Sequence, residues 1–281
     1  MYNKGRPLVG FHYLFCSPGQ QKQTFMKIFA FANQKGGVGK TTSAITLAHQ
    51  FAMEGFHTLL VDLDPQGHVA ICLGLEKGPG LYRLLGQEES LSDVVIPARP
   101  NLDILTSDKS TEKVKRLFTL ANFSEKTLHH LLSNSTYDVI FIDMAPSLDV
   151  LHLSGLLASD WVIIPTRLDA LAVDGVKEIA LTMAELSRRG HPFSGYSILP
   201  TFFERLTRES FIQLEELTRV FGKHVLPPIP QDTRVREAPA YGKTLLEYSP
   251  HCTALLGIRT NDHRIGGYVQ AFTRLKEIVN G

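Results

Sequence analysis

Short apolar runs alternate with helix-period segments along most of the chain. The runs expected to form strands are 27–32, 57–63, 102–105, 139–143, 161–165, 196–200 and, with a weaker pattern, 224–228. Helical periodicity occurs in 41–54, 112–132, 150–158, 173–189, 209–221 and 268–280. Strands that are apolar on both faces are typical of parallel sheets covered on both sides. The pattern therefore predicts an α/β fold with a doubly wound, mostly parallel sheet and helices on both faces.

The domain organisation follows from where this alternation begins. The first strong strand pattern starts directly after Met26, and the preceding segment mixes a short apolar run with polar residues and a Ser-Pro-Gly break. We therefore expect residues 1–25 to be a disordered extension and residues 26–281 to form one domain. The connection 74–101 is rich in Gly and Pro and is expected to hold one or two short helices.

Composition excludes several classes of protein. The 281 residues carry 29 Lys and Arg against 28 Asp and Glu, so any nucleic-acid binding must come from a local patch. The three cysteines are widely spaced and form no C-x-x-C pair, which argues against a disulfide scaffold or a zinc site. No apolar stretch approaches the roughly 18–20 residues that span a bilayer. These features indicate a cytoplasmic protein.

A glycine-rich turn joins the first predicted strand to the first predicted helix. Backbone N–H groups of such a turn, with the positive end of the following helix, can cradle phosphate oxygens. The strict G-x-x-x-x-G-K-[ST] pattern is not met, because position 34 is Gln and a second lysine precedes the glycines. We expect Lys40 to reach the β- and γ-phosphates and Thr41 to ligate Mg²⁺. The predicted phosphate-binding residues are Lys35, Gly36, Gly37, Val38, Gly39, Lys40, Thr41 and Thr42.

Carboxylates end two of the predicted strands. Asp62 and Asp64 close the second strand, and Asp143 closes the fourth in the form of a Walker B segment. Ligands bind at this edge of a parallel sheet, and an unpaired buried carboxylate is costly, so we expect Asp62 and Asp143 to join Thr41 around the metal. No glutamate follows Asp143 as a general base, which leaves Asp64 to position water. The predicted cofactors are ATP and Mg²⁺.

Five segments together make the sequence similar to the ParA/MinD group of deviant Walker A ATPases, within the P-loop NTPase fold, and most like its ParA/Soj branch. The segments are 32–48, 59–68, 141–148, 162–166 and 229–243. The resemblance implies three catalytic residues: Lys35, which would reach the partner's nucleotide across a dimer interface, Lys40 and Asp64. It also implies that Pro230 and Asp232 contact adenine, with Asp232 standing where Asn is more usual.

The resemblance further implies a partitioning ATPase that dimerises on ATP and binds double-stranded DNA without sequence preference. Slow hydrolysis, stimulated by a ParB-like partner protein, would release the DNA and so segregate a chromosome or plasmid, with the protein associated with the nucleoid. Among the basic residues of the matching segments, Arg208, Arg234 and Arg236 are the predicted DNA contacts. Acidic residues are interleaved with them, so a solvated mixed-charge surface is the alternative.

Other members of this fold offer alternative functions. A MinD-like protein would end in a basic amphipathic helix, but the basic residues of 268–280 are only Arg274 and Lys276, so we expect this helix to pack in the core without stable membrane association. Neither Cys72 nor Cys252 stands where iron–sulfur relatives carry paired cysteines. Intact Lys40 and Asp143 argue against a non-enzymatic binding module. The insert 251–267 has no assigned role.

Overall fold

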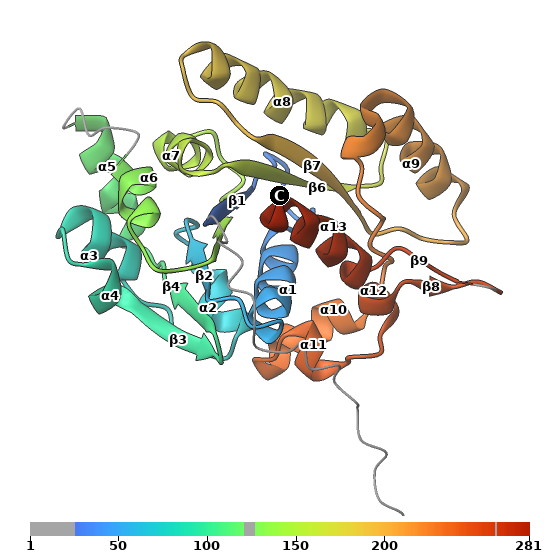
Figure 1. Ribbon diagram of the computed structural model, residues 1–281, viewed down its shortest axis with the longest axis horizontal. Helices are drawn as coiled ribbons and strands as arrows, with labels where there is room; N and C mark the ends of the chain where they lie inside the picture. Colours follow the sequence, from blue (N-terminus) through green and yellow to red (C-terminus); the bar gives the residue numbers. More distant parts are fainter. Residues whose placement is uncertain (1–25, 121–126, 262) are drawn as a thin grey trace, which may run out of the picture.

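The computed structural model describes residues 26–120, 127–261 and 263–281, so the expectation for residues 1–25 lies outside the described residues. A seven-stranded sheet in the order β3-β4-β2-β5-β1-β6-β7 forms its centre (Figure 1). Only β3 runs antiparallel to its neighbour, and every other pairing is parallel. The strands are β1 (Lys27–Phe31), β2 (Thr58–Asp62), β3 (Val95–Arg99), β4 (Leu102–Leu105), β5 (Val139–Asp143), β6 (Trp161–Arg167) and β7 (Gly195–Thr201).

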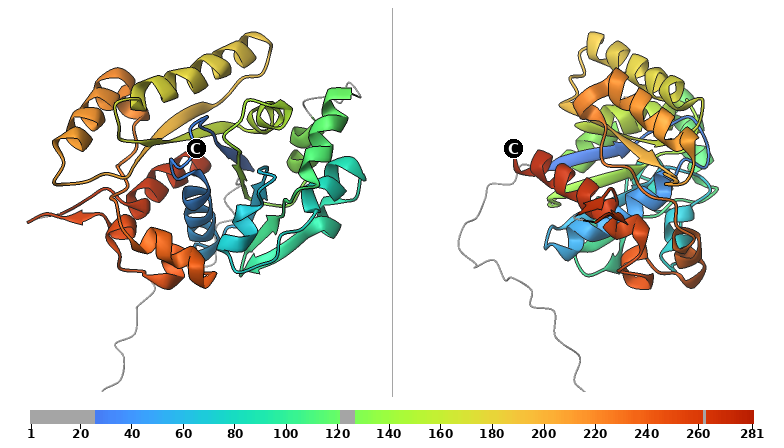
Figure 2. Two further views of the ribbon diagram at one scale, coloured as in Figure 1. Left: turned by 180° about the vertical axis from the view of Figure 1, so that it is seen from behind. Right: turned by 90° about the vertical axis from the view of Figure 1, so that its right-hand side faces the viewer.

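Helices cover both faces of this sheet, which confirms the predicted fold class (Figure 2). The longer ones are α1 (Lys40–Met53), α5 (Thr111–Leu120), α7 (Val150–Ala158), α8 (Ala172–Arg188), α9 (Arg208–Phe221) and α13 (Tyr268–Asn280). The shorter ones are α2 (His68–Cys72), α3 (Gly80–Gly86), α4 (Leu91–Val94), α6 (Thr127–Ser133), η1 (Gly222–His224), α10 (Arg234–Glu237), η2 (Ala238–Tyr241), α11 (Leu245–Tyr248) and α12 (Thr253–Leu256). A small hairpin, β8 (Ile258–Arg259) and β9 (Arg264–Ile265), follows α12.

Two hydrophobic cores lie on opposite faces of the sheet, because successive residues of a strand point to opposite sides. Along β1, Ile28 and Ala30 join the core under α7 and α8, whereas Phe29 and Phe31 join the core under α1 and α13. The second core is rich in aromatic rings, with Phe141 5.4 Å from Phe29 between ring centroids. Both cores extend to the strand ends that carry the candidate site, so packed side chains hold these ends in place.

Helix α13 completes the second core. Its buried residues are Tyr268, Ala271, Phe272, Leu275 and Val279, and the Phe272 ring lies 4.8 Å from that of Phe51 on α1. The predicted core-packing role of this helix is therefore confirmed. Across the described ranges, no helix combines the length and apolar character needed to cross a membrane.

Three sequence predictions differ from the structure. The segment 224–228 is not a strand: Val225 forms a single bridge to Ile198, and Pro227 and Pro228 have no N–H to continue a ladder. The helix predicted over 112–132 is described as α5 and α6 on either side of residues 121–126. The connection 74–101 holds the expected short helices α3 and α4, but also β3, an antiparallel edge strand with an irregular register between Pro97 and Arg99.

Candidate nucleotide site

The glycine-rich turn between β1 and α1 places Lys40 at the first position of the helix. Gly37 and Gly39 have φ angles of 71° and 88°, a conformation in which glycine avoids the strain of a Cβ. The Nζ of Lys40 donates to the carbonyl oxygens of Asn33 and Lys35, each at 2.9 Å. Burial lowers the pKa of Lys40, while Asp143 and Asp64 act in the opposite direction. A buried ammonium held this way is ready for an anion at the start of the helix.

Asn33 holds the start of this turn, a role that the motif did not reveal. Its side-chain amide donates to the carbonyl oxygen of Pro165 on β6 at 2.8 Å, and its Oδ1 accepts the backbone N–H of Lys35 at 2.9 Å. The residue is 1% exposed. Asn33 therefore fixes the loop to the neighbouring strand. Only the tertiary structure brings Pro165 close enough to make this contact.

Asp62 and Asp143 stand opposite each other at the ends of β2 and β5, as predicted from the two strand ends. Both are fully buried, at 0% and 1% exposure. Asp62 accepts the backbone N–H groups of Asp64 and Val69, whereas Oδ1 of Asp143 has no hydrogen-bond partner among the residues that the structure describes. Burial raises the pKa of Asp143 to about 7, against the hydroxyl of Thr41 and the charge of Lys40. Burial and the facing Asp143 also raise the pKa of Asp62.

This acidic pair fits a magnesium ion. A buried carboxylate oxygen without a donor is the kind of group that a cation stabilises. In the part of the chain that the structure describes, no group of three or more His, Cys, Asp or Glu residues could hold a metal. Mg²⁺ commonly takes one or two carboxylates and completes its shell with phosphates and water. Thr41 and Asp143, with Asp62 directly opposite Asp143, are suited to that arrangement.

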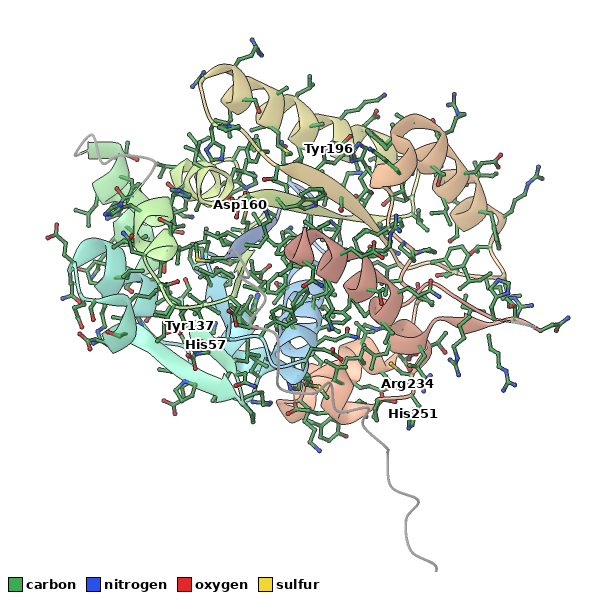
Figure 3. The ribbon with its side chains drawn as sticks, in the orientation of Figure 1. His57, Tyr137, Asp160, Tyr196, Arg234 and His251 are labelled. Atoms are coloured by element: carbon green, nitrogen blue, oxygen red, sulfur yellow. The ribbon has the colours of Figure 1, made fainter. Side chains whose placement is uncertain are left out.

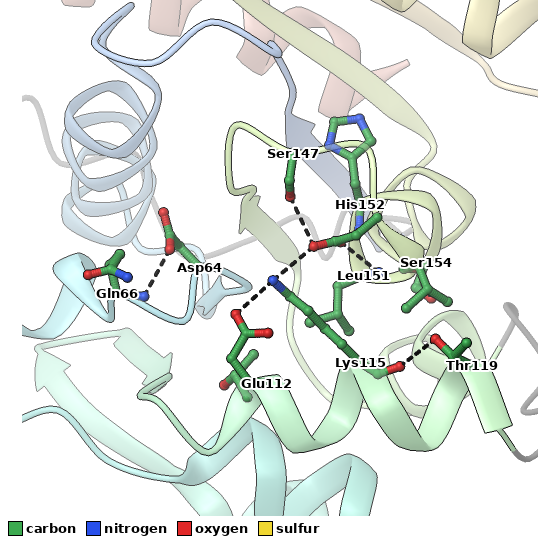
Figure 4. Close-up of polar contacts among 12 residues, drawn as sticks. Asp64, Gln66, Glu112, Lys115, Thr119, Ser147, Leu151, His152 and Ser154 are labelled. Carbon is green, nitrogen blue, oxygen red and sulfur yellow. Dashed lines mark hydrogen bonds and ion pairs between the residues drawn. The ribbon is translucent and has the colours of Figure 1, made fainter.

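Asp64 lies in the loop after β2, and its Oδ1 accepts the backbone N–H of Gln66 at 2.9 Å (Figure 4). The residue is half-buried. Its charge acts on the pKa values of both Lys40 and Asp143, so the fold brings all three into one electrostatic neighbourhood.

Lys35 extends away from the loop that it begins. Its Nζ donates to the carbonyl oxygen of Leu171 at 2.7 Å and lies 3.7 Å from a carboxylate oxygen of Asp169. The side chain is 32% exposed. The two lysines of the motif are thus divided, with Lys40 buried beside the acidic pair and Lys35 at the surface near the start of α8.

A network that the sequence did not predict holds the loop after Asp143 (Figure 4). Asp149 caps α7 by accepting the backbone N–H groups of Leu151 and His152, both at 3.1 Å. Its other oxygen binds Nζ of Lys115 on α5 at 2.9 Å and the hydroxyl of Ser147 at 3.1 Å. Burial would raise the pKa of Asp149, but Lys115 and the helix N–H lower it below its usual value. This network ties the loop between Asp143 and α7 to a second helix.

A pocket of about 450 Å³ opens beside the phosphate loop. Pro230 and Asp232, the residues expected to contact adenine, line it together with Gly37, Gly39 and Thr42. The rest of the wall was not predicted from the sequence, and its members include Arg167, Thr201, Phe202, Ile229 and Tyr268. Phe202 has a φ angle of 57°, and the guanidinium of Arg167 lies 4.9 Å from the centre of its ring. These residues come from the ends of β6 and β7, from the loop before α10 and from α13, so no local sequence motif predicts them.

The carboxylate of Asp232 has a structural task that differs from the predicted contact with adenine. Its side chain is 3% exposed, and Oδ1 binds Nε of Arg234 at 2.7 Å. Oδ2 accepts the backbone N–H groups of Thr253 and Ala254 at 2.9 and 3.4 Å. Both oxygens therefore have partners within the protein, and Asp232 joins α10 to the start of α12. A direct contact between Asp232 and a base stays a prediction.

The three predicted DNA contacts do not form one group. Arg208 is exposed at the start of α9. Arg234 lies on α10 (Figure 3) and is paired with Asp232. Arg236 is exposed but lines the nucleotide pocket. Arg208 is the member whose guanidinium has neither of these engagements.

The sheet order, the phosphate loop and the acidic strand ends define a P-loop NTPase, and the AAA domain family matches residues 26–192. The chromosome-partitioning ATPase Soj of Treponema pallidum is 34% identical over 238 residues, which span 80% of this chain and 91% of that protein. Soj of Thermus thermophilus is 36% identical over 79% of this chain and 88% of its own length. The chain therefore belongs to the Soj/ParA family of partitioning ATPases, which confirms the predicted family and its ATPase activity.

Solved structures agree with this assignment. A plasmid partition protein of Borrelia burgdorferi bound to AMPPNP is 26% identical, with a TM-score of 0.69 over 79% of this chain and 95% of that one. Apo McdA of Cyanothece has a TM-score of 0.75 over 91% and 100% of the two chains, and at 22% identity it shows the fold alone. The expectation of ATP and Mg²⁺ is confirmed at the level of this family.

Proposed function

We propose that this chain is an ATP-driven DNA-partitioning switch. In this proposal ATP converts a monomer into a dimer that binds double-stranded DNA without sequence preference, on the nucleoid. Slow hydrolysis, stimulated by a ParB-like partner protein, releases the DNA and so moves a chromosome or plasmid. The observation that carries the proposal is the division of the two loop lysines between a buried and a surface position.

The buried half of the site is suited to the chain's own nucleotide. Lys40 and the N–H groups of the glycine turn would hold the phosphates, and Thr41 and Asp143 would hold Mg²⁺, with Asp62 behind them. When bound, Mg²⁺ neutralises phosphate charge. The ion would also give the unpartnered Oδ1 of Asp143 a counter-charge, which favours ionised Asp143.

The surface half is suited to a second subunit. Lys35 is held by one carbonyl and by a distant ion pair, and exposed ion pairs contribute only about 0–1 kcal/mol. Its release from Asp169 therefore costs little. A lysine that reached the partner's triphosphate would stabilise the charge of the transition state, as an arginine finger does.

Hydrolysis would depend on Asp64, because Met144 and Ala145 follow Asp143 in place of a general base. Positioning water without a strong base supports turnover well below the roughly 10 s⁻¹ of a typical enzyme. A MinD-like membrane role finds no support in α13, because five of its apolar residues are buried and the helix packs against α1 and α12.

The experiment compares two variants with the parent by light scattering and phosphate release. Lys35→Ala should bind ATP but lose both the ATP-dependent dimer and hydrolysis. Asp64→Ala should keep the dimer, even accumulate it, and lose hydrolysis alone. Lys177→Ala is the matched control, because Lys177 lies on the outer face of α8 and is paired with Asp174. An unchanged ATP-dependent dimer in Lys35→Ala, or parental turnover in Asp64→Ala, would reject the assigned roles.

A further inference from the structure

The β8–β9 hairpin and the loop before α9 face each other across an open polar groove. Its described lining is Arg205 from the loop and Arg259, Thr260 and Asn261 from the hairpin, with a volume of about 560 Å³. We call this the hairpin groove. Figure 1 shows the hairpin projecting from the body of the protein beyond α12. The hairpin lies within the insert 251–267, to which the sequence analysis assigned no role.

The hairpin has a firmly fixed base. Gly257, Gly266 and Gly267 have φ angles of 81°, 77° and 91°, and a Cβ on any of them would lie 2.1–2.5 Å from a backbone atom. The backbone N–H of Gly267 donates to the carbonyl oxygen of Pro228 at 2.9 Å. The side chain of Gln270 on α13 accepts from Gly266 and donates to the carbonyl of Arg264. A protruding arm with such an anchor holds its side chains at a fixed place on the surface.

The β8–β9 hairpin carries like charges at positions where they destabilise it. Arg259 and Arg264 stand directly opposite each other in the two-stranded ladder. Like charges at directly opposed positions destabilise a strand pair. Both arginines are exposed, and so is Arg205 across the groove. Arg264 donates from Nη1 to the carbonyl oxygen of Gly257 at 3.4 Å, a contact that leaves its positive charge uncompensated. An anion between the arginines would relieve this repulsion.

Elsewhere in the molecule, many exposed arginines have acidic partners. Arg189 pairs with Glu185, Arg219 with Glu216 and Arg274 with Glu277, each one turn away on the same helix. Within residues 26–120, 127–261 and 263–281, no carboxylate forms an ion pair with Arg205, Arg259 or Arg264. The chain as a whole is nearly neutral, at +1. Arg205, Arg259 and Arg264 therefore place unpaired positive charge around one groove.

We propose that the hairpin groove binds the phosphate backbone of duplex DNA. Arg205 and Arg259 contact phosphates from the two sides of the groove, and Arg264 adds its charge from the adjoining strand. Arg208 lies three residues beyond Arg205, at the start of α9, so the proposal shifts the DNA surface from the paired Arg234 to this part of the chain. This inference rests on the DNA binding of the proposed function and assigns it to different residues.

The test is a salt titration of DNA binding by the full chain with ATP, on two unrelated duplexes. Each phosphate contact contributes about −0.9 to the slope of log K against log salt concentration. The double variant Arg259→Ala/Arg264→Ala should flatten the slope by about 1.8 for each bound subunit, equally on both duplexes. Arg259→Lys/Arg264→Lys should keep most of the slope. The control Arg219→Ala/Arg274→Ala removes the same charge from paired arginines and should leave the slope near that of the parent.

Two further measurements separate this inference from a folding defect and from the proposed function. The thermal midpoint of the hairpin variant should be no lower than that of the parent, because the substitutions remove a pair of opposed like charges. Its DNA-free ATPase rate should equal that of the parent, because neither arginine lines the nucleotide pocket. A parent that binds DNA, with an unchanged slope in the hairpin variant, overturns the hairpin groove and leaves the proposed function standing. A parent that binds neither duplex overturns both.

Discussion

The two walls of the nucleotide pocket are built in contrasting ways. The phosphate wall is one continuous turn, in which glycines and Lys40 follow each other along the chain. The opposite wall gathers Arg167, Phe202, Ile229 and Tyr268 from positions spread over a hundred residues. Backbone geometry dictates the first wall, so its residue types and their spacing are fixed together. Packing dictates the second wall, where many side chains of suitable shape can serve.

The largest expected effect is on the phosphate wall, from Lys40→Ala. This change removes the buried cation beside Asp143 and leaves the acidic pair without its compensation. Loss of one such group costs about 100- to 1,000-fold in turnover, so ATP hydrolysis should fall by at least that factor. Steady-state phosphate release measures it, with Lys223→Ala, an exposed lysine after α9, as the control. Hydrolysis within tenfold of the parent would show that Lys40 is not at the phosphates.

The same contrast explains which parts of the molecule the sequence predicts. The parallel strands are predictable because both of their faces are buried, and the ends of β2 and β5 therefore bring Asp62 and Asp143 together as expected. The edge strand β3 was missed because it is only half-buried and contains Pro97, which weakens the strand pattern.

The site shows the same division between local and tertiary information. A glycine-rich turn before a helix is a local motif that predicts the position of Lys40. The backbone partners of Asp232 are not local, because Thr253 and Ala254 lie 21 and 22 residues away. Asn33 and Phe202 likewise acquire their roles only through contacts across the sheet or pocket. Residue spacing along the chain encodes none of these contacts, which depend on how α12 and β6 pack.

A smaller effect, on the free energy of unfolding, is expected from Gly267→Ala at the base of the β8–β9 hairpin. Gly267 has a φ angle of 91°, and a Cβ there would lie 2.5 Å from the backbone N of Gly257 and from the carbonyl oxygen of Leu255. Gly190 is a matched control, because its φ angle is 92° and no described atom lies within 4 Å of the position of an added Cβ. Backbone strain alone costs about 1–3 kcal/mol, so Gly190→Ala should lose about 1 kcal/mol and Gly267→Ala clearly more.

Chemical denaturation of the two glycine variants measures this difference in the free energy of unfolding. Equal losses would mean that the base of the hairpin relaxes around an added methyl group. That outcome would indicate that the base of the hairpin is packed less rigidly than the phosphate wall.

The smallest expected effect concerns His49, which joins α1 to the C-terminal side. Its Nδ1 lies 2.8 Å from the hydroxyl of Thr244, and burial, first among the causes, lowers the pKa of His49. The folded protein thus favours the neutral ring. The contribution of neutral His49 to the free energy of unfolding is fully present above the unfolded-state pKa of about 6.5. As the pH falls below that value, the unfolded chain takes up the proton first and this stability is lost. His49→Gln keeps an amide for Thr244 but does not titrate, so the thermal midpoint of the parent minus that of the variant should shrink between about pH 8 and pH 5. Other buried histidines are common to both proteins, so their contributions cancel in this difference. A difference in thermal midpoint that stays constant across the range would show that His49 is equally easy to protonate in the folded and unfolded chains.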